Sequence, residues 1–199
     1  LFNYTRRASS VAHIGAIDLG GDNPIRIQSM TTTNTNDTEA CVRQAEEIIK
    51  AGGELVRFTT QGSREAENMK NINAGIRADG YQTPLVADVH FNPNVADVAA
   101  LYCEKVRVNP GNYVDPARKF IKQEYTDEEY AHELQKIEDR FVPFLNICKE
   151  NHTAIRIGVN HGSLSDRIRN RYGDTPEGIV ESCLEFLRIC KKENFHDVV

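Results

Sequence analysis

The sequence predicts a TIM-type (β/α) barrel that is truncated after about five to six strands and is preceded by a β-hairpin. Apolar strand patterns alternate with amphipathic helical patterns five times along the 199 residues, which is typical of a parallel α/β sheet. Polar side chains end four successive strands, and TIM-type barrels carry their active sites at this end of the strands. A doubly wound sheet would gather its site at one switch point, and no glycine-rich nucleotide-binding pattern follows the first strand.

The composition argues against several classes of protein. The net charge of −5 disfavours bulk binding to nucleic acid or to a membrane surface, so any anion site must be local. No apolar run is long enough to span a bilayer and no signal-peptide pattern occurs, so we expect a cytoplasmic protein. The five cysteines form no C-x-x-C pair, and we expect reduced thiols, mostly in the core: Cys41, Cys103, Cys148, Cys183 and Cys190.

The N-terminal region is expected to lead into the barrel. Residues 1–10 are polar and predict a flexible arm, so residues 11–199 form the partial barrel. Residues 11–19 and 24–30 alternate as strands around the turn-forming residues 20–23, which predicts a hairpin. The seven polar residues 31–37 either line a ligand site or form a solvated loop.

The remaining elements follow from apolar periodicity and helix caps. Thr38 is a candidate N-cap of a helix that ends at Gly52-Gly53, and Asn92-Pro93 is an N-cap followed by proline at the first helical position. Further helices begin near Ser63 and at Thr175-Pro176. The strands expected after the hairpin span residues 55–60, 84–91, 105–109, 154–160 and, as the start of a sixth barrel strand, 197–199.

One connection is longer than a normal crossover. Residues 111–153 exceed a loop plus a helix, and what fills them is left open. Thr126 begins a capping box with Glu129, and an apolar helical stripe follows. Pro143 is expected to kink or break this helix, leaving residues 144–150 as a last helical piece.

Three arginines are the main candidates for ligand binding. Arg57, Arg107 and Arg156 occupy the same position and the same face in their strands. Converging guanidinium groups repel one another unless an anion joins them, and their forked geometry suits phosphate oxygens. This predicts a diphosphate or bis-phosphate ligand. The alternative is that each arginine pairs with a carboxylate such as Asp88.

Other polar residues at the strand ends could complete the site. Asp88 and His90 share one strand face and could act as acid and base, orient the arginines or, as the least favoured role, bind a metal. Asparagine amides and a serine hydroxyl suit phosphate oxygens, although they could instead satisfy turn backbone groups or, for the serine, cap a helix. These residues are Asn109, Asn112, Asn160 and Ser163. The run Arg167, Arg169 and Arg171 is interpreted as a solvated basic face.

Four segments together resemble the barrel domain of the hydroxymethylbutenyl diphosphate synthases of the non-mevalonate isoprenoid pathway. The resemblance covers about residues 9–199, and the long segment 111–153 is similar to the longer form of plants and some bacteria. The matching segments are residues 24–31, 85–91, 106–112 and 155–164.

The resemblance implies an oxidoreductase. Two electrons and two protons open the ring of 2-C-methyl-D-erythritol 2,4-cyclodiphosphate and remove a hydroxyl, giving 4-hydroxy-3-methylbut-2-enyl diphosphate. Ferredoxin or flavodoxin supplies the electrons, and a 4Fe–4S cluster held by three cysteines and a glutamate in a C-terminal domain contacts the reacting centre. By position in the motifs, Arg57, Arg107 and Arg156 would clamp the diphosphate.

The chain departs from this pattern in one respect. None of its five cysteines lies at a ligand position of the family, so the iron–sulfur domain is expected to lie outside this chain, which alone would be inactive and bind no metal. Unpaired sheet edges predict homo-oligomers. The alternatives are a pterin-binding transferase of the dihydropteroate synthase type, whose lysine and stacking site on later strands are missing here, and a non-catalytic module that binds phosphate esters.

Overall fold

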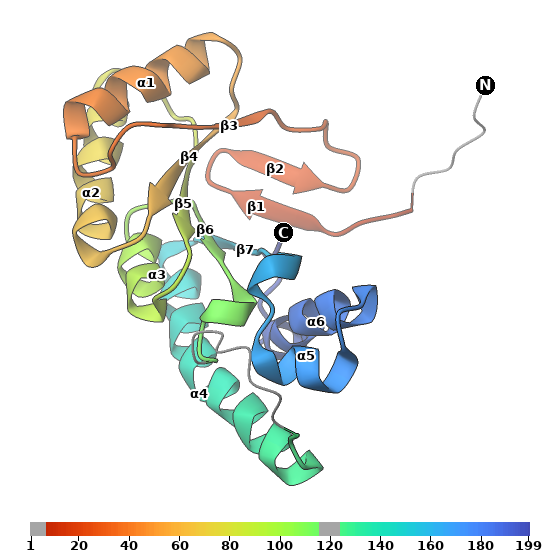
Figure 1. Ribbon diagram of the computed structural model, residues 1–199. Helices are drawn as coiled ribbons and strands as arrows, with labels where there is room; N and C mark the ends of the chain where they lie inside the picture. The colour runs from red at the N-terminus through yellow and green to blue at the C-terminus, as the bar shows by residue number, and fades with distance from the viewer. Residues whose placement is uncertain (1–6, 116–123) are drawn as a thin grey trace.

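The computed structural model describes residues 7–115 and 124–199 and contains one five-stranded parallel sheet. The strands lie in chain order, β3-β4-β5-β6-β7, as in the wall of a (β/α) barrel (Figure 1). They are β3 (Gln28–Met30), β4 (Leu55–Thr60), β5 (Leu85–Val89), β6 (Lys105–Val108) and β7 (Ala154–Ile157). The expected truncated barrel is therefore confirmed.

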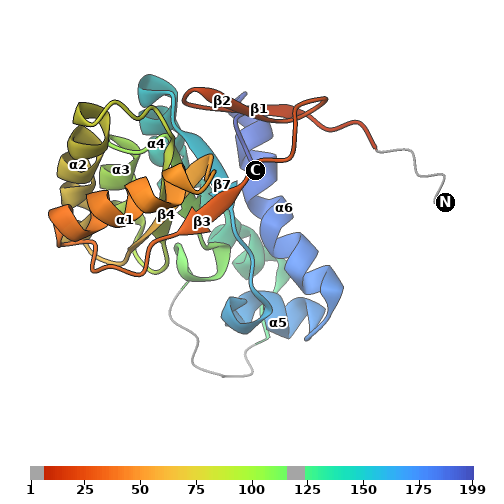
Figure 2. The same ribbon diagram turned by 90° about the horizontal axis from the view of Figure 1, so that it is seen from above.

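Helices connect the strands and cover one side of the sheet. They are α1 (Thr38–Lys50), α2 (Ser63–Ala78), α3 (Pro93–Ala100), α4 (Asp127–Asn151), α5 (Asp166–Tyr172) and α6 (Pro176–Lys192), with short 3₁₀ turns η1 (Pro110–Asn112) and η2 (His161–Ser163). Figure 2 shows α1 and α2 on one flank of the molecule and α6 on the opposite flank.

One apolar core lies between the sheet and these helices. In β4 to β7 every second residue, such as Phe58, Ala87 and Val106, faces outward into this core and is buried. The helices contribute, among others, Met69 of α2 and Phe186 of α6. The alternate strand residues consequently occupy the other side of the sheet. This inner face carries Arg57, Asp88, Lys105, Arg107 and Arg156.

The N-terminal hairpin differs from the expected one. It pairs β1 (Val11–Ile14) with β2 (Ile17–Gly20), and Gly15 in the turn has a φ of +54°. The turn expected at residues 20–23 instead bends the chain away after β2, and β3 is the first barrel strand. Ile14 packs with Leu55, Val86 and Ala154, so the hairpin covers the amino-terminal end of the inner face (Figure 1).

The two ends of the chain agree only in part with expectation. Residues 1–6 of the expected arm lie outside the described residues, and Ser9 accepts a hydrogen bond from the Gly21 backbone N–H at 3.0 Å, so this part of the arm lies against the hairpin. At the other end, Val198 forms a parallel bridge with Ile155, as expected for the start of a sixth barrel strand.

Two local expectations are wrong in detail, and a third is confirmed. Asp37, not Thr38, caps α1, because its carboxylate accepts the Ala40 backbone N–H. Pro143 does not break α4. Proline removes only one backbone hydrogen bond, and the helix stays continuous because buried residues on both sides of Pro143 pack into the core. The expected capping box of Thr126 and Glu129 is present. Residues 116–123 of the long connection 111–153 lie outside the described residues.

The cysteines confirm the expectation of free thiols, mostly in the core. All five cysteines are free thiols; four are buried, and Cys183 is half-buried. No helix in the described parts of the chain combines the length and the apolarity that crossing a membrane requires.

Candidate anion-binding site

Strand register brings the predicted charged residues together on the inner face. Asp88 of β5 is the register partner of Arg107 of β6, which in turn is the partner of Arg156 of β7. Neighbouring parallel strands lie about 4.8 Å apart, so side chains of one register level on one face are in reach of each other. The period-two prediction for these three residues therefore matches the observed register.

Asp88 is the centre of the cluster. Its carboxylate accepts hydrogen bonds from Arg57 Nη2 and, at 3.2 Å, from Arg107 Nη1, and lies 3.0 Å from His90 Nε2. The alternative in which arginines pair with Asp88 thus holds for two of the three arginines. Burial favours the neutral carboxyl, but the hydrogen bonds from His90 and Arg57 and the charge of Arg57 outweigh it and lower the pKa of Asp88.

Gly158 makes room for Arg107. A β-carbon at this glycine would lie 2.2 Å from Arg107 Nε, so the guanidinium rests directly against the backbone that follows β7. Arg107 is 4% exposed, and burial lowers its pKa while the charge of Asp88 raises it and the charges of Arg57 and Arg156 lower it further, with a net decrease. Gly158, which has no side chain, therefore leaves the space that the Arg107 guanidinium occupies.

Lys105 belongs to the same cluster and was missed from sequence. It precedes Arg107 by two residues, so it lies on the inner face one level nearer the amino-terminal end of β6. The side chain is 2% exposed, and Nζ donates a long hydrogen bond of 3.4 Å to Gln28 Oε1 of β3. The sequence did contain a signal for this position, because residues two apart in a strand lie on the same face.

Positive charge is in excess on the inner face. Arg156 is half-buried and forms no ion pair or hydrogen bond within the described residues, and Lys105 has no carboxylate partner there. The inner face therefore carries four cationic side chains and, among the described residues, the one carboxylate of Asp88, which pairs with two of them. Such an excess is costly in a partly desolvated site and is relieved by a bound anion.

The loops after β6 and β7 are locked together at the carboxyl end. Ser163 Oγ lies 3.1 Å from Asn109 Oδ1 and 3.2 Å from the Asn160 carbonyl oxygen and can donate its one proton to either. A β-carbon at Gly111 would lie 1.7 Å from the Ser163 carbonyl oxygen. Ser163 does not cap α5, because Ser165 does so by accepting the Ile168 N–H. Asn109 is buried and fixed by this contact.

Two predicted residues are less constrained. Asn160 is exposed, and Asn112 is half-buried in η1. Neither side chain makes a hydrogen bond within the parts of the chain that are described. Their amide groups are therefore not used by turn backbone, and no contact joins them to the cluster around Asp88.

The interpretation of Arg167, Arg169 and Arg171 as a solvated basic face is wrong for Arg167, whereas Arg171 is exposed as expected. Arg167 is 2% exposed and binds both carboxylate oxygens of Glu185, at 2.7 and 2.8 Å, and those of Asp115, at 3.2 and 3.1 Å. Tyr130 donates to Glu185 at 2.6 Å, so this buried network joins α4, α5, α6 and the loop after η1. Arg169 pairs with Asp174 at 3.0 Å, and Arg171 pairs with Asp127.

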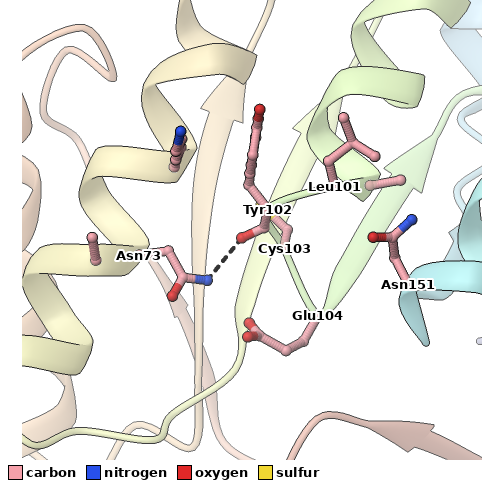
Figure 3. Close-up of a pocket in the computed structure, with 9 residues that line it drawn as sticks. Asn73, Leu101, Tyr102, Cys103, Glu104 and Asn151 are labelled. Carbon is pink, nitrogen blue, oxygen red and sulfur yellow. Dashed lines mark hydrogen bonds between the residues drawn. The ribbon is translucent and has the colours of Figure 1, made fainter.

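A surface pocket of about 350 Å³ lies at the other end of the sheet (Figure 3). Two of its polar groups already have partners: Asn73 Nδ2 donates to the Tyr102 carbonyl at 2.8 Å, and Glu104 pairs with Arg77 at 2.8 Å. Glu104 precedes β6, so this pocket is at the amino-terminal end, which in TIM-type barrels serves stability. We do not consider it as the ligand site.

The cysteines do not fit an iron–sulfur cluster. Burial raises the pKa of the Cys103, Cys148 and Cys190 thiols, and the thiolate is the form that binds iron. No three His, Cys, Asp or Glu side chains are grouped as metal ligands within residues 7–115 and 124–199.

These features define a (β/α) barrel wall that presents clustered cations on its inner face. The GcpE TIM-barrel domain family matches residues 9–199, and the chain belongs to this family. Membership agrees with the parallel sheet in chain order and with the barrel predicted from sequence.

Several relatives are highly similar to this chain. It is 76% identical over all 199 residues to the 4-hydroxy-3-methylbut-2-en-1-yl diphosphate synthases (flavodoxin) of Phocaeicola vulgatus and Bacteroides thetaiotaomicron, and covers 32% of each. The synthase of Protochlamydia amoebophila is 50% identical over 192 residues, which are 96% of this chain and 29% of that protein. The chain thus spans about a third of the length of these curated relatives.

Solved structures are more distant. A dihydropteroate synthase from Xanthomonas albilineans is 14% identical with a TM-score of 0.42, over 91% of this chain and 73% of that one. Another, from Burkholderia cenocepacia, is 13% identical with a TM-score of 0.43, over 98% and 91%. Likeness at this level gives the pterin-binding alternative no support.

Proposed function

We propose that this chain is the substrate-binding barrel domain of a cytoplasmic 4-hydroxy-3-methylbut-2-enyl diphosphate synthase. Its inner face would hold the diphosphate of 2-C-methyl-D-erythritol 2,4-cyclodiphosphate. The observation that carries the proposal is the group of four cations around one carboxylate on the inner face of β4 to β7. The names of the 76% identical relatives support the choice of this diphosphate ester.

Each residue has a part that follows from its position. Arg57, Arg107 and Arg156 bind phosphoryl oxygens through charge-assisted hydrogen bonds. Asp88 holds two of these guanidinium groups in place before the ligand enters. Other polar groups near the strand ends complete the pocket and suit the remaining phosphate and hydroxyl oxygens: His90, Asn109, Asn112, Asn160 and Ser163.

The chain supplies binding and orientation, and the redox step needs more. The 4Fe–4S cluster of this enzyme family would be held by residues outside this chain, because its cysteines do not fit a cluster. The names of the relatives include flavodoxin, which we propose as the electron donor, with ferredoxin as the alternative. No catalytic residue is assigned to the described part of the chain.

Calorimetric titration with the cyclodiphosphate tests the proposal. The protein is expressed from its complete reading frame, and Arg156→Ala is compared with Arg43→Ala, an exposed arginine on the outer helix α1. Loss of a charge-assisted contact of about 1.5–3 kcal/mol should weaken binding roughly 10- to 100-fold for Arg156→Ala and leave Arg43→Ala unchanged. Arg107→Ala should weaken binding at least as much.

Two results would overturn the proposal. One is the absence of binding by the unmodified protein. The other is unchanged affinity in both Arg107→Ala and Arg156→Ala while circular dichroism reports intact folds.

A further inference from the structure

Lys105 is a buried cation without a counter-ion. Its side chain is 2% exposed, and a lysine is almost never buried so deeply unless it is paired. An ammonium group has three N–H donors, yet within the described residues Nζ makes one hydrogen bond, of 3.4 Å, to the uncharged Gln28. The folded chain therefore leaves most of the binding capacity of this group unused.

The groups around Lys105 do not compensate its charge. Arg57 on β4 and Arg156 on β7 both act on it as like charges, and Arg107 follows it on the same face of β6. Asp88 on β5 is already bound by two arginines and contacted by His90. The strand neighbours of Lys105 at its own level are the apolar Val86 and Ala154, which pack on the hairpin.

Burial, and the charges of Arg156 and Arg57, lower the pKa of Lys105 to about 8. A substantial part of the free protein therefore carries a neutral amine at this position in mildly alkaline solution. A ligand with two negative charges next to the arginines reverses the local balance, because it attracts the ammonium form and offers oxygens to its N–H groups.

We propose that Lys105 is a fourth anion-binding residue of this site and that its amine takes up a proton from the solvent when a diphosphate ester binds. The inference rests on the proposed function and deepens it. The three arginines grip the ligand in a fixed charge state, whereas Lys105 adapts its charge to occupancy. In mildly alkaline solution the neutral amine of the empty site avoids the repulsion that a fourth permanent cation would add.

Proton uptake measured by calorimetry tests this inference. The probe is symmetrical dimethyl diphosphate, which carries two negative charges and no proton that titrates near pH 8. Binding to the protein from its complete reading frame is measured at pH 8.5 in EPPS and in Tris buffers, whose different ionisation enthalpies reveal how many protons are exchanged. With a pKa of about 8 in the free protein, uptake of about three quarters of a proton per ligand is expected.

Two variants of Lys105 and one control separate the outcomes. Lys105→Met should bind more weakly without taking up a proton, and Lys105→Arg should bind without uptake because its charge is permanent. Lys191→Met, at an exposed position in the last turn of α6, should match the unmodified protein. Thermal unfolding checks that each variant is folded.

The possible negative results distinguish between an error in the role of Lys105 and an error in the proposed function. Binding of the probe with no proton uptake, or uptake that persists in Lys105→Arg, overturns the role of Lys105 and leaves the proposed function standing. Absence of probe binding by the unmodified protein overturns the proposed function and this inference with it.

Discussion

Replacing Asp88 by asparagine should cost a large part of the stability of this protein. The Asp88→Asn change keeps the shape of the side chain and removes the carboxylate that binds Arg57 and Arg107 and contacts His90. Removing one partner of a buried ion pair costs about 3–5 kcal/mol, because the remaining charges stay buried without compensation. For a chain of 199 residues the entropy of unfolding is about 0.4 kcal/mol per degree, so Tm should fall by about 7–12 °C.

Asp174→Asn provides the matched control. Asp174 also contacts a histidine and an arginine, His161 and Arg169, but its side chain is 50% exposed. Exposed ion pairs contribute about 0–1 kcal/mol, so the control should lose little stability. The assay is thermal and urea unfolding of both variants, with and without inorganic diphosphate.

The anion should stabilise Asp88→Asn more than it stabilises the unmodified protein, because it replaces the missing negative charge between the guanidinium groups. Equal losses of stability in Asp88→Asn and Asp174→Asn would refute the reasoning. Burial and the pairing with two arginines would then make no measurable difference to the contribution of Asp88.

Acid titration of stability gives the same prediction a second test. The folded protein lowers the pKa of Asp88, so its contribution is present above the ordinary carboxyl pKa and is lost as the pH falls through the folded-state value. The difference in unfolding free energy between the unmodified protein and Asp88→Asn should therefore shrink below about pH 4. A difference that stays constant down to pH 2 would contradict the assigned ionisation of Asp88.

Three further substitutions test the close contacts of the site and its support. Gly158→Ala should displace the Arg107 guanidinium and weaken diphosphate binding by about tenfold or more in calorimetry, with little change in Tm. Gly111→Ala should destabilise the protein by about 1–3 kcal/mol in urea unfolding, because its β-carbon collides with the Ser163 backbone, and should speed amide exchange in that loop. Arg167→Met should cost about 3–5 kcal/mol by the same assay, because it leaves two buried carboxylates without a cation; a loss below 1 kcal/mol would contradict the observed network.

Sequence reasoning predicted the inner face well because strand parity is a local property. Once alternate apolar residues fix which side of a strand meets the helices, Arg57, Asp88, Arg107 and Arg156 must share the other side. The same argument applied to Lys105, which shares the parity of Arg107. It was overlooked because lysine at the start of a strand is usually exposed, and only the register of β6 with its neighbours determines its burial.

Features that depend on distant residues could not be predicted. Arg167 sits in a run of alternating arginines that fits a solvated helix face, but its partners lie 18 and 52 residues away in the sequence. The hairpin turn was predicted at the wrong place for a related reason. The glycines at 20 and 21 are typical of a turn, but the pairing of Ile14 with Ile17 places the hairpin turn at Gly15.

The hairpin has a consequence for how Lys105 exchanges protons with solvent. Ile14, Leu55, Val86 and Ala154 pack together at the amino-terminal end of the inner face, so apolar side chains close the side of Lys105 that faces the hairpin. Solvent does not reach Lys105 through the hairpin end, and the side chain is only 2% exposed elsewhere. With an ester bound above this lysine, exchange of its protons with solvent should become slower than in the empty site.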